Sequence, residues 1–222
     1  MMRLFYQEFR VIVWRWFATG GFILYILLST TYAGYKSQKA KVDPAPSYVC
    51  HVKQGLLTIA ADPYLTWEKM KTVFDLKELD KMGVIPIQVI VTNDGEDTVV
   101  VDGTEIHLLD GKNRPIEGMA VDEVVRVVLG KVDPTSPKTS SPSPIPFPRS
   151  SGRRGDIFDI QTDLSNKAFG EVRVAPKSTF GGFLFFRLPD QQRVLNGYKV
   201  YVPDVKNLRS GEELLFFEIG LK

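Results

Sequence analysis

Val-Ile-Pro-Ile-Gln-Val-Ile-Val-Thr, residues 84–92, is the stretch whose pattern predicts the class of fold. Its β-branched apolar side chains recur at every second position, at Ile85, Ile87, Val89 and Val91. Successive side chains of a strand point to opposite faces, so these four share one face while Gln88 and Thr92 lie on the other. The stretch therefore predicts a β-strand with one buried face.

The residues after this strand predict a hairpin. Asn93-Asp-Gly-Glu-Asp97 is rich in turn formers, because Asn and Gly adopt positive φ at little cost. We expect the chain to turn here and to run back as strand over 98–102 and 104–110. Asp110-Gly-Lys then predicts a second turn.

The rest of the soluble part mixes strands with short helices. Helical spacing of valines and leucine predicts a helix over 121–129, and capping signals predict one or two short helices within 66–82. A further helix is expected near 156–168. Further strands are expected at 55–61, 171–175, 179–188, 197–202 and 212–219. The fold class predicted is mainly β, an antiparallel sandwich with short helices.

Residues 16–35 carry no charge and are bounded by Arg15 and Lys36. Twenty residues of helix rise about 30 Å, the thickness of the hydrocarbon core of a bilayer. Aromatic rings lie near both ends, where they prefer the lipid headgroups. We therefore predict a single transmembrane helix, with these residues as its membrane anchor: Trp16, Phe22, Ile23, Leu24, Ile26, Leu27, Leu28 and Tyr32.

A cleaved signal peptide is the alternative for the same stretch. Thr31-Tyr-Ala33 before Gly34 resembles a small-x-small cleavage site, and arginines precede the apolar run. Basic residues flank the span on both sides, so the usual cytoplasmic bias of Lys and Arg is nearly balanced. The signal-like layout favours a cytoplasmic, basic N-terminus at 1–15. The large domain is then expected on the periplasmic, extracytoplasmic side of the cell membrane.

Proline content divides the remainder of the chain. Residues 36–47 are predicted as a stalk, because Pro44 and Pro46 favour an extended backbone. Residues 48–222 are predicted as one β-sandwich domain with a Pro/Ser-rich insertion at 131–155. That insertion is expected to be either a solvated loop or a strap on a protein partner. Its candidate partner-binding residues are Pro142, Pro144, Pro146, Phe147, Pro148, Arg153 and Arg154.

Composition argues against several classes of function. The net charge of +2 disfavours nucleic acid as the main partner, and a single cysteine allows no intrachain disulfide. Cys50 and His51 are neighbours on a predicted strand and point to opposite faces, so they chelate a metal poorly. Five acidic residues between 94 and 110 lie at turn positions, which favours backbone capping over calcium binding. We expect no catalytic residue, no metal and no cofactor.

Four stretches occur in an order that suggests a family. They are Ile87-Gln-Val-Ile-Val-Thr-Asn-Asp-Gly95, Leu109-Asp-Gly111, Val174-Ala-Pro176 and Gly182-Phe-Leu-Phe-Phe-Arg-Leu-Pro189. This order resembles the telokin-like, immunoglobulin-like β-sandwich domains of uncharacterised bacterial envelope proteins. The resemblance covers about 84–219 and implies an immunoglobulin-like fold and an envelope location. It implies no catalytic residue, and the helical stretch at 66–82 and the Pro-rich insertion depart from it.

The function expected is binding. The chain is predicted to be a non-catalytic, membrane-anchored accessory subunit or assembly factor, whose partners are membrane lipid and other protein subunits of a membrane complex. One rival is a secreted, soluble ligand-binding domain released after Ala33. The other is a hydrolase or metal protein with a site assembled from scattered acidic residues and His51 or His107.

Overall fold

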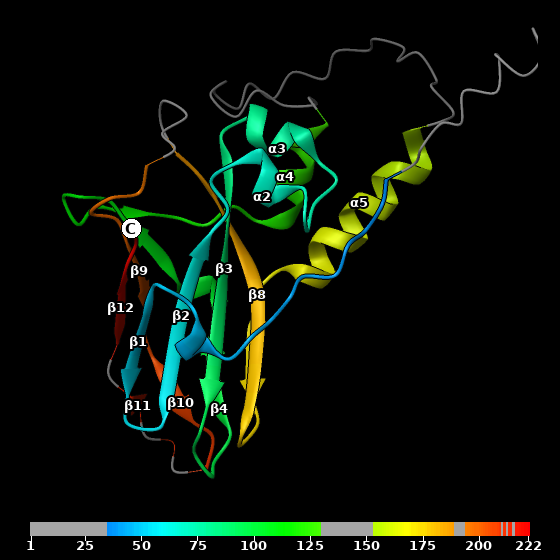
Figure 1. Ribbon diagram of the computed structural model, residues 1–222. Coiled ribbons are helices and arrows are strands. Elements are labelled where there is room, and N and C mark those ends of the chain that lie inside the picture. The colour runs from blue at the N-terminus through cyan, green and yellow to red at the C-terminus, as the bar shows by residue number, and fades with distance from the viewer. Residues whose placement is uncertain (1–34, 130–152, 189–193, 210, 212, 215) are drawn as a thin grey trace, which may run out of the picture. The chain divides into compact units, whose positions relative to one another are not determined.

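The computed structural model describes residues 35–129, 153–188, 194–209, 211, 213–214 and 216–222 (Figure 1). They belong to one compact unit that begins at Tyr35. Within it the chain is mainly β, with three four-stranded sheets and a few helices. No helix in this part of the chain is both long enough and apolar enough to cross a membrane. The predicted span lies outside the described residues except for Tyr35.

The first sheet is built around the stretch that opens the sequence argument. Its antiparallel strands follow the order β1 (His51–Gln54), β2 (Leu57–Pro63), β3 (Val84–Asn93) and β8 (Ser178–Arg187). Along its full length β3 pairs with β8, from Val84 opposite Arg187 to Asn93 opposite Ser178. Figure 1 shows β2, β3 and β8 side by side.

Two antiparallel sheets with shorter strands form a second β layer, which packs against the first sheet. One contains β4 (Val99–Asp102), β7 (Glu171–Val174), β10 (Val205–Asn207) and β11 (Glu213–Leu214). The other contains β5 (His107–Leu109), β6 (Pro115–Ile116), β9 (Lys199–Val202) and β12 (Phe217–Gly220). The main hydrophobic core combines side chains from all three sheets. It contains Ile85, Ile87, Val89 and Val91, so the predicted apolar face of β3 is confirmed.

The predicted hairpin is wrong. β3 and β4 do not pair, because β3 lies between β2 and β8 while β4 lies between β10 and β7. The turn after Asn93 carries the chain from one sheet to another, and the Asp94 N–H donates to the Leu56 carbonyl at 2.8 Å. β8 offers β3 a partner for all ten of its residues, whereas β4 has only four.

The second face of β3 is buried as well, contrary to the one-faced pattern predicted. Residues 41–48 cross this face and include the 3₁₀ turn η1 (Ala45–Ser47). The Gln88 side chain donates to the Lys41 carbonyl at 3.0 Å, and Thr92 Oγ1 accepts from the Ala45 N–H at 2.8 Å. Gly181 leaves room for Val42, since a Cβ there would lie 2.9 Å from a Val42 methyl group. The segment predicted as a stalk therefore takes part in the packing of the domain.

Helices cover the rest of this face. They are α2 (Trp67–Met70), α3 (Lys77–Lys81), α4 (Val121–Val128) and α5 (Arg153–Lys167), which confirms the predicted helical regions. A second hydrophobic cluster joins them to the sheet, and it includes Phe74, Leu79, Val124, Leu164 and Phe183. The Phe74 ring meets the Phe183 ring edge-on at 4.9 Å between centroids. Figure 1 shows α5 extending away from the strands.

A close backbone approach makes Gly103 sensitive to substitution. Gly103 begins the 3₁₀ turn η2 (Gly103–Glu105), and a Cβ there would lie 2.2 Å from the Phe169 carbonyl oxygen. We expect Gly103→Ala to lower the free energy of unfolding by about 1–3 kcal/mol, because the backbone must shift to relieve the overlap. Urea unfolding of the full chain in detergent micelles measures this. Gly170→Ala is the control, since nothing lies within 4 Å of its added Cβ; equal effects of the two substitutions would contradict the prediction.

Candidate functional site

Most of the site residues predicted from the sequence lie outside the described part. This holds for the membrane-anchor residues between Trp16 and Tyr32 and for the proline-rich residues 142–148. Arg153 and Arg154 belong to the first turn of α5. The anchor and the partner-binding strap therefore stay predictions.

The cysteine and the two histidines are not brought together into one cluster. His51 is exposed on β1, with Nδ1 2.7 Å from the Tyr48 carbonyl oxygen, while Cys50 is buried beside it. His107 lies on β5 in a different sheet, opposite Tyr201. Among the described residues, no group of three or more His, Cys, Asp or Glu side chains is placed to hold a metal ion.

The acidic residues near the predicted turns act as caps. Asp102 Oδ1 accepts a hydrogen bond from the Thr104 N–H at 2.9 Å. Asp110 Oδ1 accepts from the N–H groups of Lys112 and Arg114 at 2.8 and 2.9 Å. The bond from the Arg114 N–H contributes most to the lowering of the Asp110 pKa. The turn interpretation is confirmed for both carboxylates.

Asn93, part of the stretch that carries the family resemblance, is a buried structural link. Its Nδ2 donates to the carbonyl oxygens of Asp97, Val174 and Ala175 at 2.8, 3.1 and 3.3 Å. Its Oδ1 accepts from the Gly95 N–H at 2.9 Å. One amide thus joins the end of β3, the turn that follows it and the end of β7.

A buried ion pair on α5 holds the start of the described chain. Lys167 Nζ lies 2.6 Å from Asp163 Oδ2, and their side chains are only 10% and 6% exposed. The hydroxyl groups of Tyr35 and Ser37 both donate to the same carboxylate. We call these four residues the Asp163 cluster.

The Asp163 cluster also ties α5 to the helical layer. Lys167 Nζ donates to the Val73 carbonyl at 2.7 Å and lies 5.1 Å from the centre of the Phe74 ring. Burying a charge is costly unless it is paired and hydrogen-bonded, and here both partners meet that condition. The cluster therefore fixes α5 against the residues that follow α2 and against the first residues of the domain.

The pairing of two of the four residues in the Asp163 cluster could be predicted from the sequence. Asp163 and Lys167 are four residues apart in a predicted helix, a spacing at which opposite charges pair. Tyr35 is 128 residues away from Asp163 along the chain, at the end of the predicted membrane span. No local pattern could have paired it with α5.

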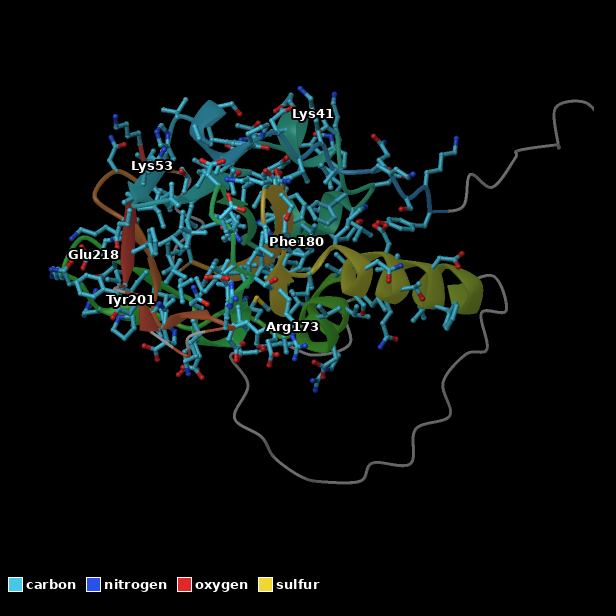
Figure 2. The ribbon with its side chains drawn as sticks, turned by 90° about the horizontal axis from the view of Figure 1, so that it is seen from below. Lys41, Lys53, Arg173, Phe180, Tyr201 and Glu218 are labelled. Carbon is cyan, nitrogen blue, oxygen red and sulfur yellow. The ribbon has the colours of Figure 1, made fainter. Side chains whose placement is uncertain are left out.

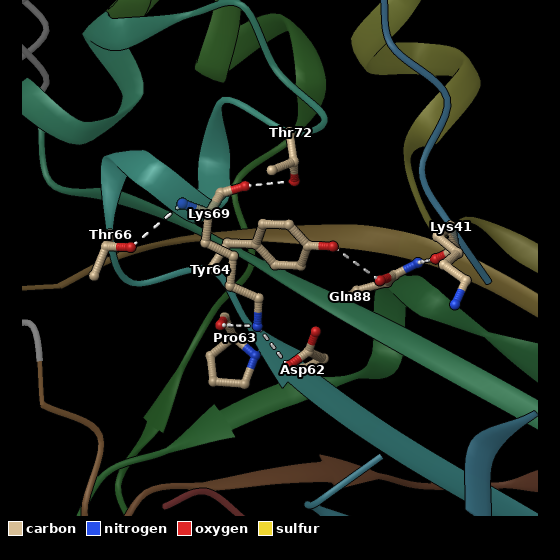
Figure 3. A network of polar contacts seen from close by, with 8 residues as sticks. All are labelled: Lys41, Asp62, Pro63, Tyr64, Thr66, Lys69, Thr72 and Gln88. Atoms are coloured by element: carbon tan, nitrogen blue, oxygen red, sulfur yellow. Dashed lines mark hydrogen bonds and ion pairs between the residues drawn. The ribbon is translucent and has the colours of Figure 1, made fainter. Parts of the chain in front are cut away.

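A second polar network lies on the face of the first sheet that residues 41–48 cross (Figure 3). The Tyr64 hydroxyl donates to Gln88 Oε1 at 3.2 Å, and burial raises the pKa of this phenol. Lys69 Nζ lies 2.6 Å from Asp62 Oδ1 and 4.5 Å from the centre of the Tyr64 ring. Because Gln88 also holds the Lys41 carbonyl, the network links the strands, α2 and the N-terminal segment.

Removing the Tyr64 hydroxyl tests the strength of this link. We expect Tyr64→Phe to lower the free energy of unfolding by about 1–2 kcal/mol, because the buried Gln88 Oε1 loses its donor. Thermal unfolding of the full chain, followed by far-ultraviolet circular dichroism, is the measurement. Thr72→Val removes an exposed hydroxyl that donates to the Lys69 carbonyl and is expected to change stability by less than about 0.5 kcal/mol. If Tyr64→Phe changes stability as little as Thr72→Val does, the Tyr64–Gln88 hydrogen bond adds nothing to stability.

Comparison with known proteins adds little to this description. No protein-family profile matches the chain, and no curated protein matches it. Among solved structures, the yjhA protein from Bacillus subtilis is similar over 68% of this chain and 76% of that chain, with 12% identity and a TM-score of 0.34. A similarity at this level does not establish a shared fold. The class that the described residues define is a mainly β domain with antiparallel sheets and short helices.

Proposed function

We propose that the chain is a non-catalytic, single-span membrane protein whose β-domain serves as an accessory subunit or assembly factor of a larger membrane complex. The observation that carries the proposal is the uncharged run that begins at Trp16 and is bounded by Arg15 and Lys36. A run of this length without a polar face has no side that favours water. In this proposal the N-terminus is cytoplasmic and the β-domain is extracytoplasmic.

The proposal includes an immunoglobulin-like, telokin-like sandwich for the domain. Antiparallel pairing within all three sheets and a core shared between two β layers support it. The stretches that carry the resemblance also have structural tasks, since Asn93 joins two strand ends and Asp110 caps a turn. Domains that share these turns need the same residues at them, regardless of what each domain binds.

A binding role agrees with how the domain uses its charged side chains. Several acidic residues at the turns pair with basic residues or cap backbone N–H groups, as with Glu96 and Lys177 at 2.8 Å. The partner in this proposal is a protein subunit beside the anchor, contacted by the proline-rich segment and by Arg153 and Arg154. Proline-rich chains bind at low entropic cost because they are already extended.

The test is extraction of the full chain in mild detergent, followed by size separation and mass spectrometry. We expect the chain to sediment with membranes, to resist alkaline washing and to co-migrate with defined membrane proteins. Deletion of residues 131–152 is expected to reduce that co-migration without releasing the chain from the membrane. A chain that stays in the membrane but migrates alone would refute the accessory role.

A secreted domain is the second candidate, and one observation favours it. The compact unit begins at Tyr35, two residues after the possible cleavage site at Ala33. Cleavage there would leave Tyr35 free to bind Asp163, so the domain would remain whole. Intact mass separates the two candidates, because a soluble chain that starts at Gly34 excludes the retained anchor.

A further inference from the structure

The residues that follow the uncharged run are held directly against α5. The run ends at Tyr35, and Tyr35 and Ser37 already bond to Asp163 on α5. No spacer of free chain therefore separates the run from this helix. Figure 1 shows the chain from Tyr35 onward running beside α5 before it reaches the sheet.

The N-terminal half of α5 exposes a large apolar side chain. Ile160 and Leu164 are buried in the helical cluster, but Phe158 is 70% exposed. Its exposed neighbours on the helix include Gln161, Thr162 and Ser165, which are uncharged. The other view of the molecule also shows α5 extending beyond the strands (Figure 2). The Phe158 ring is therefore able to contact a surface outside the domain.

The segment that runs beside α5 carries exposed lysines. Lys36 and Lys39 are exposed on the segment that bonds to α5, and within the described part of the chain neither has an ion-pair partner. Lys41 differs, since it pairs with Asp43 at 2.8 Å. Arg153 and Arg154 begin α5. Asp159, the neighbour of Phe158 in sequence, is exposed as well.

We infer that this surface, formed by Phe158, Lys36 and Lys39, rests on an anionic phospholipid bilayer where the chain leaves it. An exposed aromatic ring combined with exposed lysines is the composition of helices that lie in the membrane interface. The ring enters the boundary between headgroups and acyl chains, and the lysines bind lipid phosphates. The Asp163 cluster sets the orientation by fixing α5 to Tyr35, the last residue of the run. The inference rests on the proposed membrane anchor and adds a lipid-binding surface to it.

A fluorescent probe at position 158 tests the inference in the full chain. Phe158→Cys in a Cys50→Ala background is labelled with an environment-sensitive dye and placed in nanodiscs of phosphatidylcholine, with or without phosphatidylglycerol. We expect a blue shift of the emission and quenching by lipids brominated in their acyl chains, both larger when phosphatidylglycerol is present. Lys36→Glu combined with Lys39→Glu, or high salt, is expected to reduce the quenching.

The control is the same label at Leu208→Cys, because Leu208 is also exposed, at 53%, in the loop after β10. It is expected to emit as in water and to escape quenching. A chain that enters nanodiscs but leaves the probe at 158 unquenched overturns this inference while the anchor stands. A blue-shifted probe that lipid does not quench indicates a protein neighbour and also overturns it. A chain that does not enter nanodiscs overturns the anchor, and this inference with it.

Discussion

Asp163→Ala is expected to lower the free energy of unfolding by about 3–5 kcal/mol, because it leaves the charge of Lys167 buried and unpaired. The Lys167 side chain is 10% exposed, so water cannot replace the lost carboxylate without a rearrangement of α5. The hydroxyls of Tyr35 and Ser37 lose their acceptor at the same time. Urea unfolding of the full chain in detergent micelles measures the loss. Hydrogen exchange should show α5 and residues 35–37 losing protection together.

A matched pair on another helix provides the control. Asp122 and Arg126 on α4 have the same spacing and an oxygen–nitrogen distance of 2.5 Å, but their side chains are 63% and 55% exposed. Asp122→Ala is therefore expected to cost about 1 kcal/mol or less. Replacing both buried partners, with Asp163→Asn and Lys167→Met, should recover much of the loss because no charge remains unpaired. If Asp163→Ala and Asp122→Ala lower the free energy of unfolding equally, the assignment of Asp163 and Lys167 as a buried ion pair is contradicted.

Asn93→Ala is expected to lower the free energy of unfolding by about 2–4 kcal/mol, since three carbonyl groups lose their donor at once. These carbonyls belong to Asp97, Val174 and Ala175. Asn93→Asp should be at least as damaging, although it has the same shape, because it directs a carboxylate oxygen at carbonyl oxygens. Urea unfolding is again the measurement.

Asn166→Ala controls for the loss of an amide as such, because Asn166 is exposed on α5. Its expected effect is within about 0.5 kcal/mol. If Asn93→Ala has an equally small effect, water replaces the amide and Asn93 does not hold the strand ends together.

The sequence predicts which face of a strand is buried better than it predicts which strands pair with each other. The alternation in 84–92 placed Ile87 and Val89 in the core and Gln88 on the other face, and the structure confirms all three. It could not predict β8 as the partner of β3, because β8 begins about 90 residues later. The predicted strand at 212–219 also divides into β11 and β12, which join different sheets. Local periodicity defines a face, whereas pairing depends on the whole set of strands.

The same limit applies to the candidate site. The i, i+4 spacing of Asp163 and Lys167 is a local signal and was available in the sequence. The contact of Tyr35 with that pair spans 128 residues and was not available. The uncharged run predicts Tyr35 as the last residue of a membrane helix, whereas Tyr35 belongs to the compact unit of the β-domain. The acidic turn residues were predicted well because capping is decided within a few residues.

The way residues 35–48 are attached has a mechanical consequence. They contact the domain through separate side-chain bonds, at Asp163, at Gln88 and at Thr92, and not as a strand paired along its length. A pulling force applied at the N-terminus would break these attachments one after another, starting with Tyr35. Several small rupture events would then precede the failure of the long β3–β8 ladder. Tension from the N-terminal side would uncover Gln88 and Thr92 while the sheets stay folded.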